Sequence, residues 1–94
     1  MTLLIKRNLL STSRFRKDIK SIDKLIQLEA FDVATILCSD ISSPSHKIKK
    51  LTGYKKIYRV VVLKDYRMIY TYTETEIILL RIAHRKEIYK NLEI

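Results

Sequence analysis

The chain has 94 residues, of which 47% are hydrophobic, with only one glycine and one proline. This length and composition fit one folded domain with a single modest core, and they exclude a disordered tail and a two-domain protein. The formal net charge of +9 points to a partner that carries many negative charges.

The first part of the chain predicts a short edge strand followed by a helix. Residues 3–6 form the apolar segment that we interpret as the strand. Helix N-cap candidates follow at Ser11, Thr12 and Ser13. Beyond them, apolar residues recur at steps of four, three and four, which is typical of one helix face: Phe15, Ile19, Ile22 and Ile26.

A second helix is predicted over residues 24–40, with Asp23 as its cap. Its apolar positions form a broad face, which should pack on the rest of the domain: Leu25, Leu28, Phe31, Ala34, Leu37, Cys38 and Ile41. Cys38 lies among these positions and is predicted to be a small buried hydrophobe rather than a nucleophile. Residues 42–45, around Pro44, have the composition of a loop.

The periodicity then changes to that of β-strands. Apolar and polar residues alternate through residues 58–62 and 66–70, and residues 77–82 form a third β-rich run. The turns between them are short, which indicates a meander. The sequence therefore predicts an α+β domain in which two N-terminal helices pack on one face of a small antiparallel sheet.

The length of the first turn determines which side chains share a sheet face. A three-residue turn at residues 63–65 pairs Val61 with Arg67 and places Arg59 on the same face, whereas a two-residue turn sends the two arginines to opposite faces. The sequence leaves both registers open. We prefer the first because it collects the better core on the helix-covered face: Tyr58, Val60, Val62, Tyr66, Met68 and Tyr70.

Positive charge is concentrated in one quarter of the chain. Residues 44–67 hold 8 basic residues and 1 acidic residue, whereas residues 1–43 hold 7 and 5, and residues 68–94 hold 4 and 4. This concentration is typical of a polyanion-binding surface, and the alternative is a solvated lysine-rich face. We predict RNA contacts for the basic residues of this stretch and for one later arginine: Lys47, Lys49, Lys50, Lys55, Lys56, Arg59, Lys64 and Arg81.

The expected compartment is the cytoplasm. Cys38 is the sole cysteine, so no internal disulfide forms, and no set of zinc ligands is present. Lys6 and Arg7 follow only a few apolar residues, which excludes a signal peptide, and no apolar run reaches the ~20 residues that span a bilayer. We predict a cytoplasmic protein with no membrane association, no metal and no cofactor.

Arginine, histidine and tyrosine residues in the second half of the chain suit metal-free RNA cleavage. That reaction needs a base for the 2′-hydroxyl, cations for the phosphorane and an acid for the leaving oxygen. The candidates for the cations are Arg59, Arg67, Arg85 and Arg81, because guanidinium stays charged and binds phosphate in a bidentate manner. Histidine suits proton transfer near neutral pH, which indicates His84. Tyrosine is a weaker base, but flanking cations favour its phenolate, so Tyr89 is the other candidate.

An ordered set of motifs resembles one toxin superfamily over nearly the whole chain. The motifs are Lys-Leu-x-Gly-Tyr at 50–54, Tyr-Arg at 58–59, Asp-Tyr-Arg-x-Ile-Tyr at 65–70 and His-Arg-x-x-Ile-Tyr at 84–89. In this order and spacing they are similar to those of RelE/ParE toxins of toxin–antitoxin pairs. The resemblance implies two helices on a small antiparallel sheet, and metal-independent cleavage of messenger RNA in the ribosomal A site.

The same resemblance implies roles for particular residues. Arg67, Arg85 and Tyr89 match positions that hold phosphate or transfer protons, and Arg59 matches a basic position on the same face. Val61 departs from the pattern, because RelE has a second lysine there. ParE-like members share the fold but bind and stall DNA gyrase without catalysis, so gyrase inhibition is an alternative function. A non-catalytic RNA-binding module is a third.

Partners follow from the resemblance and from the charge. The resemblance implies an antitoxin encoded beside the toxin, a toxin–antitoxin hetero-oligomer, and the ribosome with its messenger RNA. The basic stretch independently favours an acidic, amphipathic antitoxin segment that folds on binding.

Overall fold

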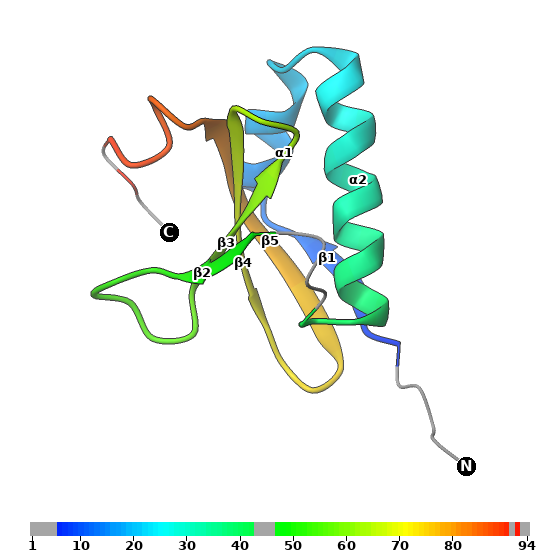
Figure 1. The fold of residues 1–94 in the computed structure, drawn as a ribbon. Helices are drawn as coiled ribbons and strands as arrows, with labels where there is room; N and C mark the ends of the chain where they lie inside the picture. Colours follow the sequence, from blue (N-terminus) through cyan, green and yellow to red (C-terminus); the bar gives the residue numbers. More distant parts are fainter. Residues whose placement is uncertain (1–5, 43–46, 91, 93–94) are drawn as a thin grey trace.

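Two helices cover one face of a five-stranded sheet (Figure 1). The computed structural model describes residues 6–42, 47–90 and 92. The elements follow the order β1 (Asn8–Ser11), α1 (Ser13–Lys20), α2 (Lys24–Ser39), β2 (Ile48–Lys50), β3 (Tyr58–Val62), β4 (Tyr66–Tyr72) and β5 (Glu76–His84). The predicted α+β class with two N-terminal helices is confirmed. Most of the strand expected at residues 3–6 and of the loop expected at 42–45 lies outside the described residues, and the first strand observed is β1.

The sheet has the strand order β1-β5-β4-β3-β2. The pairs β2–β3, β3–β4 and β4–β5 are antiparallel and form the predicted meander, whereas β1 pairs with β5 in parallel. β1 and the three-residue strand β2 extend the sheet beyond the three strands expected in the second half of the chain. The parallel pair arises because the two helices separate β1 from the meander.

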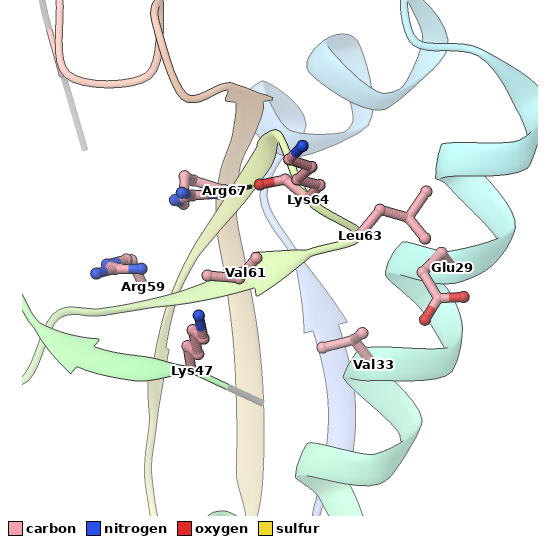
Figure 2. A pocket seen from close by; sticks show the side chains of 8 residues that line it. All are labelled: Glu29, Val33, Lys47, Arg59, Val61, Leu63, Lys64 and Arg67. Carbon is pink, nitrogen blue, oxygen red and sulfur yellow. Dashed lines mark hydrogen bonds between the residues drawn. The ribbon is translucent and has the colours of Figure 1, made fainter. Parts of the chain in front are cut away.

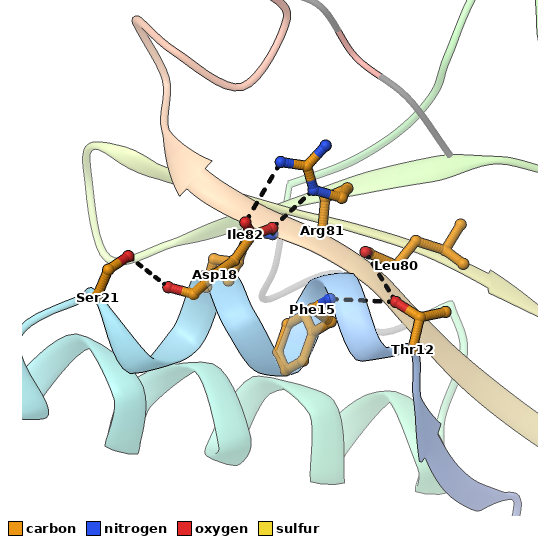
Figure 3. A network of polar contacts seen from close by, with 7 residues as sticks. All are labelled: Thr12, Phe15, Asp18, Ser21, Leu80, Arg81 and Ile82. Carbon is orange, nitrogen blue, oxygen red and sulfur yellow. Dashed lines mark hydrogen bonds and ion pairs between the residues drawn. The ribbon is translucent and has the colours of Figure 1, made fainter.

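Thr12 starts α1, as one of the three predicted caps. Its hydroxyl oxygen accepts a hydrogen bond from the backbone N–H of Phe15 at 3.1 Å and donates to the Leu80 carbonyl at 3.1 Å (Figure 3). The first bond satisfies a helix N–H that would otherwise lack a partner. The second joins the start of α1 to β5.

The prediction that the apolar residues from Phe15 to Ile26 form one face of a single helix is wrong. α1 ends at Lys20, and only Phe15 and Ile19 are its buried residues. The Gln27 amide donates hydrogen bonds to the carbonyls of Ile19 and Ile22 and so satisfies acceptors at the helix end. The regular spacing of apolar residues continues across the turn between α1 and α2.

α2 begins after Asp23, at the predicted position, although the Asp23 side chain makes no capping hydrogen bond. Its buried face includes the predicted Ala34, Leu37 and Cys38 but otherwise differs from the predicted one. The buried residues are Ala30, Val33, Ala34, Leu37 and Cys38, whereas Leu25, Leu28 and Phe31 are exposed. Apolar residues occur on every side of this helix, so periodicity could not select its packed face. The small Ala30 and Ala34 let the helix approach the sheet closely.

The core lies mainly between the helices and the sheet. Its fully buried large side chains include Phe15, Leu37, Met68, Tyr70 and Ile77. Burial raises the pKa of Tyr70 well above its ordinary value and also raises the pKa of the Cys38 thiol. Cys38 is a buried hydrophobe, as predicted.

A second, smaller cluster occupies the opposite face of the sheet. Ile69, Leu80 and Ile88 are its buried members, and partly buried side chains from the β2–β3 connection, β5 and the C-terminal segment pack against them: Leu51, Ile57, Ile78, Ala83 and Leu92. This second cluster was not predicted. It anchors the segment after β5, which contains Arg85 and Tyr89.

The three-residue turn is the one observed between β3 and β4. Val61 pairs with Arg67, and Arg59 pairs with Ile69, so both arginines lie on the sheet face opposite the helices. The preferred register is therefore confirmed. Leu63 closes the turn with φ of 54°, a left-handed conformation that costs a side chain with a Cβ roughly 1 kcal/mol.

Among the residues that the structure describes, neither helix is long and apolar enough to cross a bilayer.

Candidate functional site

Two of the sequence motifs meet at one end of the sheet. Tyr66 pairs with His84 and Arg67 pairs with Ala83 across β4 and β5. The Arg85 backbone N–H donates to the Asp65 carbonyl at 2.7 Å, and the Arg85 Nε lies 3.4 Å from Asp65 Oδ1. This ion pair is about half exposed and adds little stability by itself. The ion pair instead fixes the position of Arg85 beside the turn that precedes Arg67.

The Arg67 guanidinium is held by its own turn. Its Nη1 donates to the carbonyls of Lys64 at 3.1 Å and Tyr66 at 3.0 Å. Within the described ranges no carboxylate pairs with Arg67 or Arg59. Both guanidiniums therefore keep their charge available to a ligand. An arginine oriented by backbone carbonyls loses less entropy when it binds phosphate than a freely rotating one does.

A hollow of about 630 Å³ opens beside these arginines, at the edge of β3 (Figure 2). β2 pairs with residues 58–60 of β3, so its pairing ends at Val60. The N–H of the next residue, Val61, donates to the Lys47 carbonyl. Past that point α2 forms the far wall. The lining side chains comprise four cations, one carboxylate and three apolar groups: Lys47, Arg59, Lys64, Arg67, Glu29, Val33, Val61 and Leu63.

The hollow is thus strongly basic and has an apolar floor. Four positive groups around one carboxylate favour a ligand with more than one negative charge. Sequence reasoning predicted the four basic residues, but it missed Glu29, Val33 and Leu63. Glu29 and Val33 belong to a helix distant in sequence from the sheet, so no local pattern could have indicated them.

The remaining lysines among the predicted RNA contacts lie on β2 and on the connection that follows it. Lys49 pairs with Arg59 across β2 and β3, next to the lining residues. The others are exposed residues of β2 and the connection that follows it: Lys50, Lys55 and Lys56. These positions extend the basic surface, and their contacts with RNA stay a prediction.

Arg81 has a structural partner. Its Nε donates to Asp18 Oδ2 at 2.7 Å and its Nη2 to Asp18 Oδ1 at 3.3 Å, while the Ile82 backbone N–H also donates to Oδ2 (Figure 3). Both side chains are about one-fifth exposed. Asp18 thereby ties α1 to β5 just beyond the end of β1. RNA binding by Arg81 stays untested, and this pair makes Arg81 a link that orients the end of β5.

His84 is engaged in the turn that follows it. Its Nδ1 accepts a hydrogen bond from the Lys86 backbone N–H at 3.1 Å, and its ring lies edge-on to Tyr66 at 5.5 Å. A nitrogen that accepts from the backbone carries no proton, so the neutral ring has its proton on Nε2. In this arrangement the neutral ring has no free acceptor nitrogen for a 2′-hydroxyl proton.

This geometry predicts different results for two substitutions of His84. An asparagine oxygen can accept the Lys86 N–H as Nδ1 does. For the RNA cleavage that the sequence motifs predict, His84→Asn should therefore keep the rate within about threefold, whereas His84→Ala should lower it about tenfold by loosening the turn. The measurement is single-turnover cleavage on programmed ribosomes across a pH series. A general base would instead lose about 10²–10⁴-fold in both variants, and that result would refute the positioning role.

Tyr89 is half exposed and lies in the same C-terminal turn segment as Arg85. Within the described part of the chain, its hydroxyl has no hydrogen-bond partner. Ile88, its neighbour, is buried in the second cluster and fixes this part of the backbone. Tyr89 therefore presents a free phenol from an anchored backbone.

The comparisons with known proteins agree with the fold. Residues 9–89 match the family model described as the ParE toxin of the type II toxin–antitoxin system, parDE. No curated protein matches the chain significantly. Among solved structures, a chain of the RelB–RelE antitoxin–toxin complex from Methanococcus jannaschii is 28% identical, with a TM-score of 0.72, covering 89% of this chain and 99% of that one.

Two more distant structures share the fold. A chain of the Escherichia coli DinJ–YafQ toxin–antitoxin complex is 21% identical, with a TM-score of 0.76, and the match covers 90% of this chain and 99% of that one. A chain of the archaeal RelE–RelB complex from Pyrococcus horikoshii is also 21% identical, with a TM-score of 0.71 and coverage of 87% and 98%.

Proposed function

The chain belongs to the ParE toxin family of type II toxin–antitoxin systems, and we propose that it cleaves messenger RNA in the ribosomal A site without a metal, as its RelE-like sequence motifs imply. The observation that supports this proposal is the β3–β4–β5 register. It places Arg59 and Arg67 on one sheet face beside a basic hollow, and it places Arg85, just after β5, next to the turn that precedes Arg67.

The proposed chemistry uses the cations for charge and the C-terminal segment for proton transfer. Arg67 and Arg85 bind the scissile phosphate and stabilise the negative charge that grows on its oxygens. Arg59 and the lysines around the hollow hold the neighbouring phosphates. Tyr89 is the residue that we assign to proton transfer, because its hydroxyl is free and its backbone is anchored. His84 holds the turn that carries Arg85 and Tyr89.

Inhibition of DNA gyrase is the second candidate function. Two observations favour it: the matching family model is that of ParE toxins, and Val61 occupies a site position where the nuclease pattern has a lysine. In that case the basic hollow would bind an acidic surface of gyrase and no bond would be broken.

Pulse labelling after induction separates the two functions. A nuclease should stop incorporation of labelled methionine within minutes and shorten messenger RNAs, while DNA stays intact. The control is Lys20→Ala, an exposed lysine of α1 that lies outside the hollow and outside the predicted RNA contacts, which should behave like the unchanged toxin. DNA breaks that precede any fall in translation would refute the nuclease proposal and support gyrase inhibition.

The cognate antitoxin is the expected regulator. The similar structures described above are toxin–antitoxin complexes, and family membership implies the same partnership for this chain. Carboxylates of the antitoxin would compete with RNA for the basic hollow, so the association rate should fall as salt screens this surface.

A further inference from the structure

The loop between β2 and β3, residues 51–57, is held in one conformation by its own backbone and by β4. The Leu51 N–H donates to the Ile57 carbonyl at 2.8 Å, and the Tyr54 N–H donates to the Leu51 carbonyl at 3.4 Å. The Thr71 hydroxyl, on β4, donates to the Lys56 carbonyl at 2.6 Å. These bonds close the loop at its ends and fasten it to the sheet.

Two backbone positions in this loop have left-handed conformations. Gly53 has φ of 88° and Lys56 has φ of 55°. Glycine adopts such a value freely, whereas a lysine is strained there, because its Cβ crowds the backbone. Tyr54 is the central residue of the loop and lies between these two positions. Strained backbone is concentrated at functional sites, so this loop is a candidate for one.

Tyr54 differs from most tyrosines of this chain in its surroundings. Four others contact aromatic rings: Tyr58, Tyr66, Tyr70 and Tyr72. The Tyr54 side chain is 40% exposed. Within the described ranges its ring has no aromatic or cationic contact, and its hydroxyl has no hydrogen-bond partner. Packing therefore does not explain why a large ring occupies the centre of this loop.

Lysines flank Tyr54 on both sides in the chain. Lys50 precedes the loop, Lys55 and Lys56 follow the ring directly, and all three are exposed. Residues 41–64 contain no acidic residue, and no carboxylate in the described part of the chain pairs with these lysines. An aromatic ring among unpaired cations suits single-stranded nucleic acid, because a base can stack on the ring while its phosphates bind the cations.

The loop lies on the sheet face that carries the arginines. Leu51 and Ile57 pack in the second cluster with Ile69, and Ile69 pairs with Arg59 across β3 and β4. In Figure 1 the loop extends from the sheet on the side away from α2. A single strand whose phosphates bind the arginines would therefore reach the loop by continuing along β3.

We propose that Tyr54 is a base-stacking residue, which binds an unpaired base of the message away from the cleaved bond while Lys50 and Lys55 bind the adjoining phosphates. This proposal rests on the proposed function for the identity of the nucleic acid. Every base has a π-face, so the contact should hold the strand in place with little sequence preference. An acidic protein surface would pair with the lysines but would give the ring no flat partner.

Tryptophan fluorescence tests the stacking directly, because the chain contains no tryptophan. Tyr54→Trp keeps an aromatic ring in the loop and introduces a single indole, whose emission a stacked base quenches. The probe is a 2′-O-methyl RNA hexamer, which lacks the 2′-hydroxyl needed for cleavage, so binding is read without any reaction. We expect saturable quenching. The same hexamer without its bases carries equal charge and should leave the emission unchanged.

Phe31 provides a matched control. Its ring is 44% exposed, but it lies on α2, next to Asp32 in the chain, so Phe31→Trp should not be quenched. Binding of the hexamer should weaken about tenfold in Tyr54→Ala, because alanine removes the stacking surface. Tyr54→Phe should retain the affinity, and Phe31→Ala should leave Kd unchanged. Thermal melts establish that each variant is folded.

The contrary results are distinct. Equal quenching by the hexamers with and without bases would reduce the loop to an electrostatic contact and overturn the proposal. Unchanged affinity in Tyr54→Ala, or an equal loss in Tyr54→Phe, would overturn it too. A Tyr54→Ala toxin that binds the hexamer normally but no longer inhibits gyrase would assign the loop to a protein partner.

The uncleavable probe also separates this proposal from the nuclease function. Quenching in a toxin that cuts no message would count against the nuclease function alone. Message cleavage by a toxin whose indole at position 54 is not quenched would count against the stacking alone.

Discussion

Arg67→Ala is expected to lower the rate of message cleavage on the ribosome by about 10²–10³-fold while the domain stays folded. The guanidinium is presented to the ligand by two backbone carbonyls of its own turn, and no carboxylate within the described residues neutralises it. Alanine removes a charge that binds the transition state more strongly than the ground state, so the loss should appear in kcat rather than in binding alone. Single-turnover assays on programmed ribosomes measure it.

Arg85→Ala should give a loss of similar size, because Asp65 holds Arg85 beside the same turn. Lys20→Ala, in the exposed last turn of α1, is the matched control and should change the rate less than about threefold, because it removes one salt-screened surface charge outside the predicted RNA contacts. Thermal melts establish that each variant is folded. A double variant lacking Arg67 and Arg85 that is expressed normally and remains fully toxic would disprove the nuclease assignment at these positions.

Removing the ribosome should have an even larger effect, slowing cleavage of the same message at least about 10⁴-fold, since correct orientation of reacting groups can contribute about 10⁵ M or more in effective concentration. The described residues offer a free phenol at Tyr89 but no second group that fixes the 2′-hydroxyl in line with the leaving oxygen. His84 accepts from Lys86 instead. The ribosome would supply this alignment of the message.

The comparison uses one labelled message, presented either naked or in the A site, at equal toxin concentration. The Tyr89→Phe toxin serves as a control in both conditions, because it lacks the phenol that we assign to proton transfer and retains the ring. Chelator added to the residual reaction on naked RNA should not change its rate. Rapid cutting of naked RNA at low toxin concentration would show that the chain aligns the substrate by itself.

Local patterns predicted much of this fold because the relevant interactions are local. Thr12 caps the helix that begins one residue later, and alternation along β3 and β4 separates inward from outward residues. The register was predicted from the core that it would form, because only the three-residue turn gathers Tyr58, Val60 and Met68 on the helix-covered face. Arg59 and Arg67 were placed correctly relative to each other for that reason.

Other features depend on partners far apart in sequence. Asp18 and Arg81 are 63 positions apart, and no pattern around Arg81 distinguishes an arginine that binds Asp18 from one that binds RNA. α2 has apolar residues on all sides, so its packed face depended on where Ala30 and Ala34 allow a close approach. β2 was missed because it is three residues long and two of them are lysines, which strands disfavour.

Among the described residues after β5, 85–90 and 92, few make contacts with the rest of the domain. Ile88 is the buried anchor of this segment, and the Arg85 N–H bond to Asp65 is its main link to the sheet. Detaching it would expose little apolar surface, so it should open at a free energy well below that of global unfolding. Arg85 and Tyr89 would move with it while β4 and Arg67 stay in place. Warming should therefore separate the proposed catalytic groups before the domain melts, and amide exchange at 86–90 should be faster than in β4.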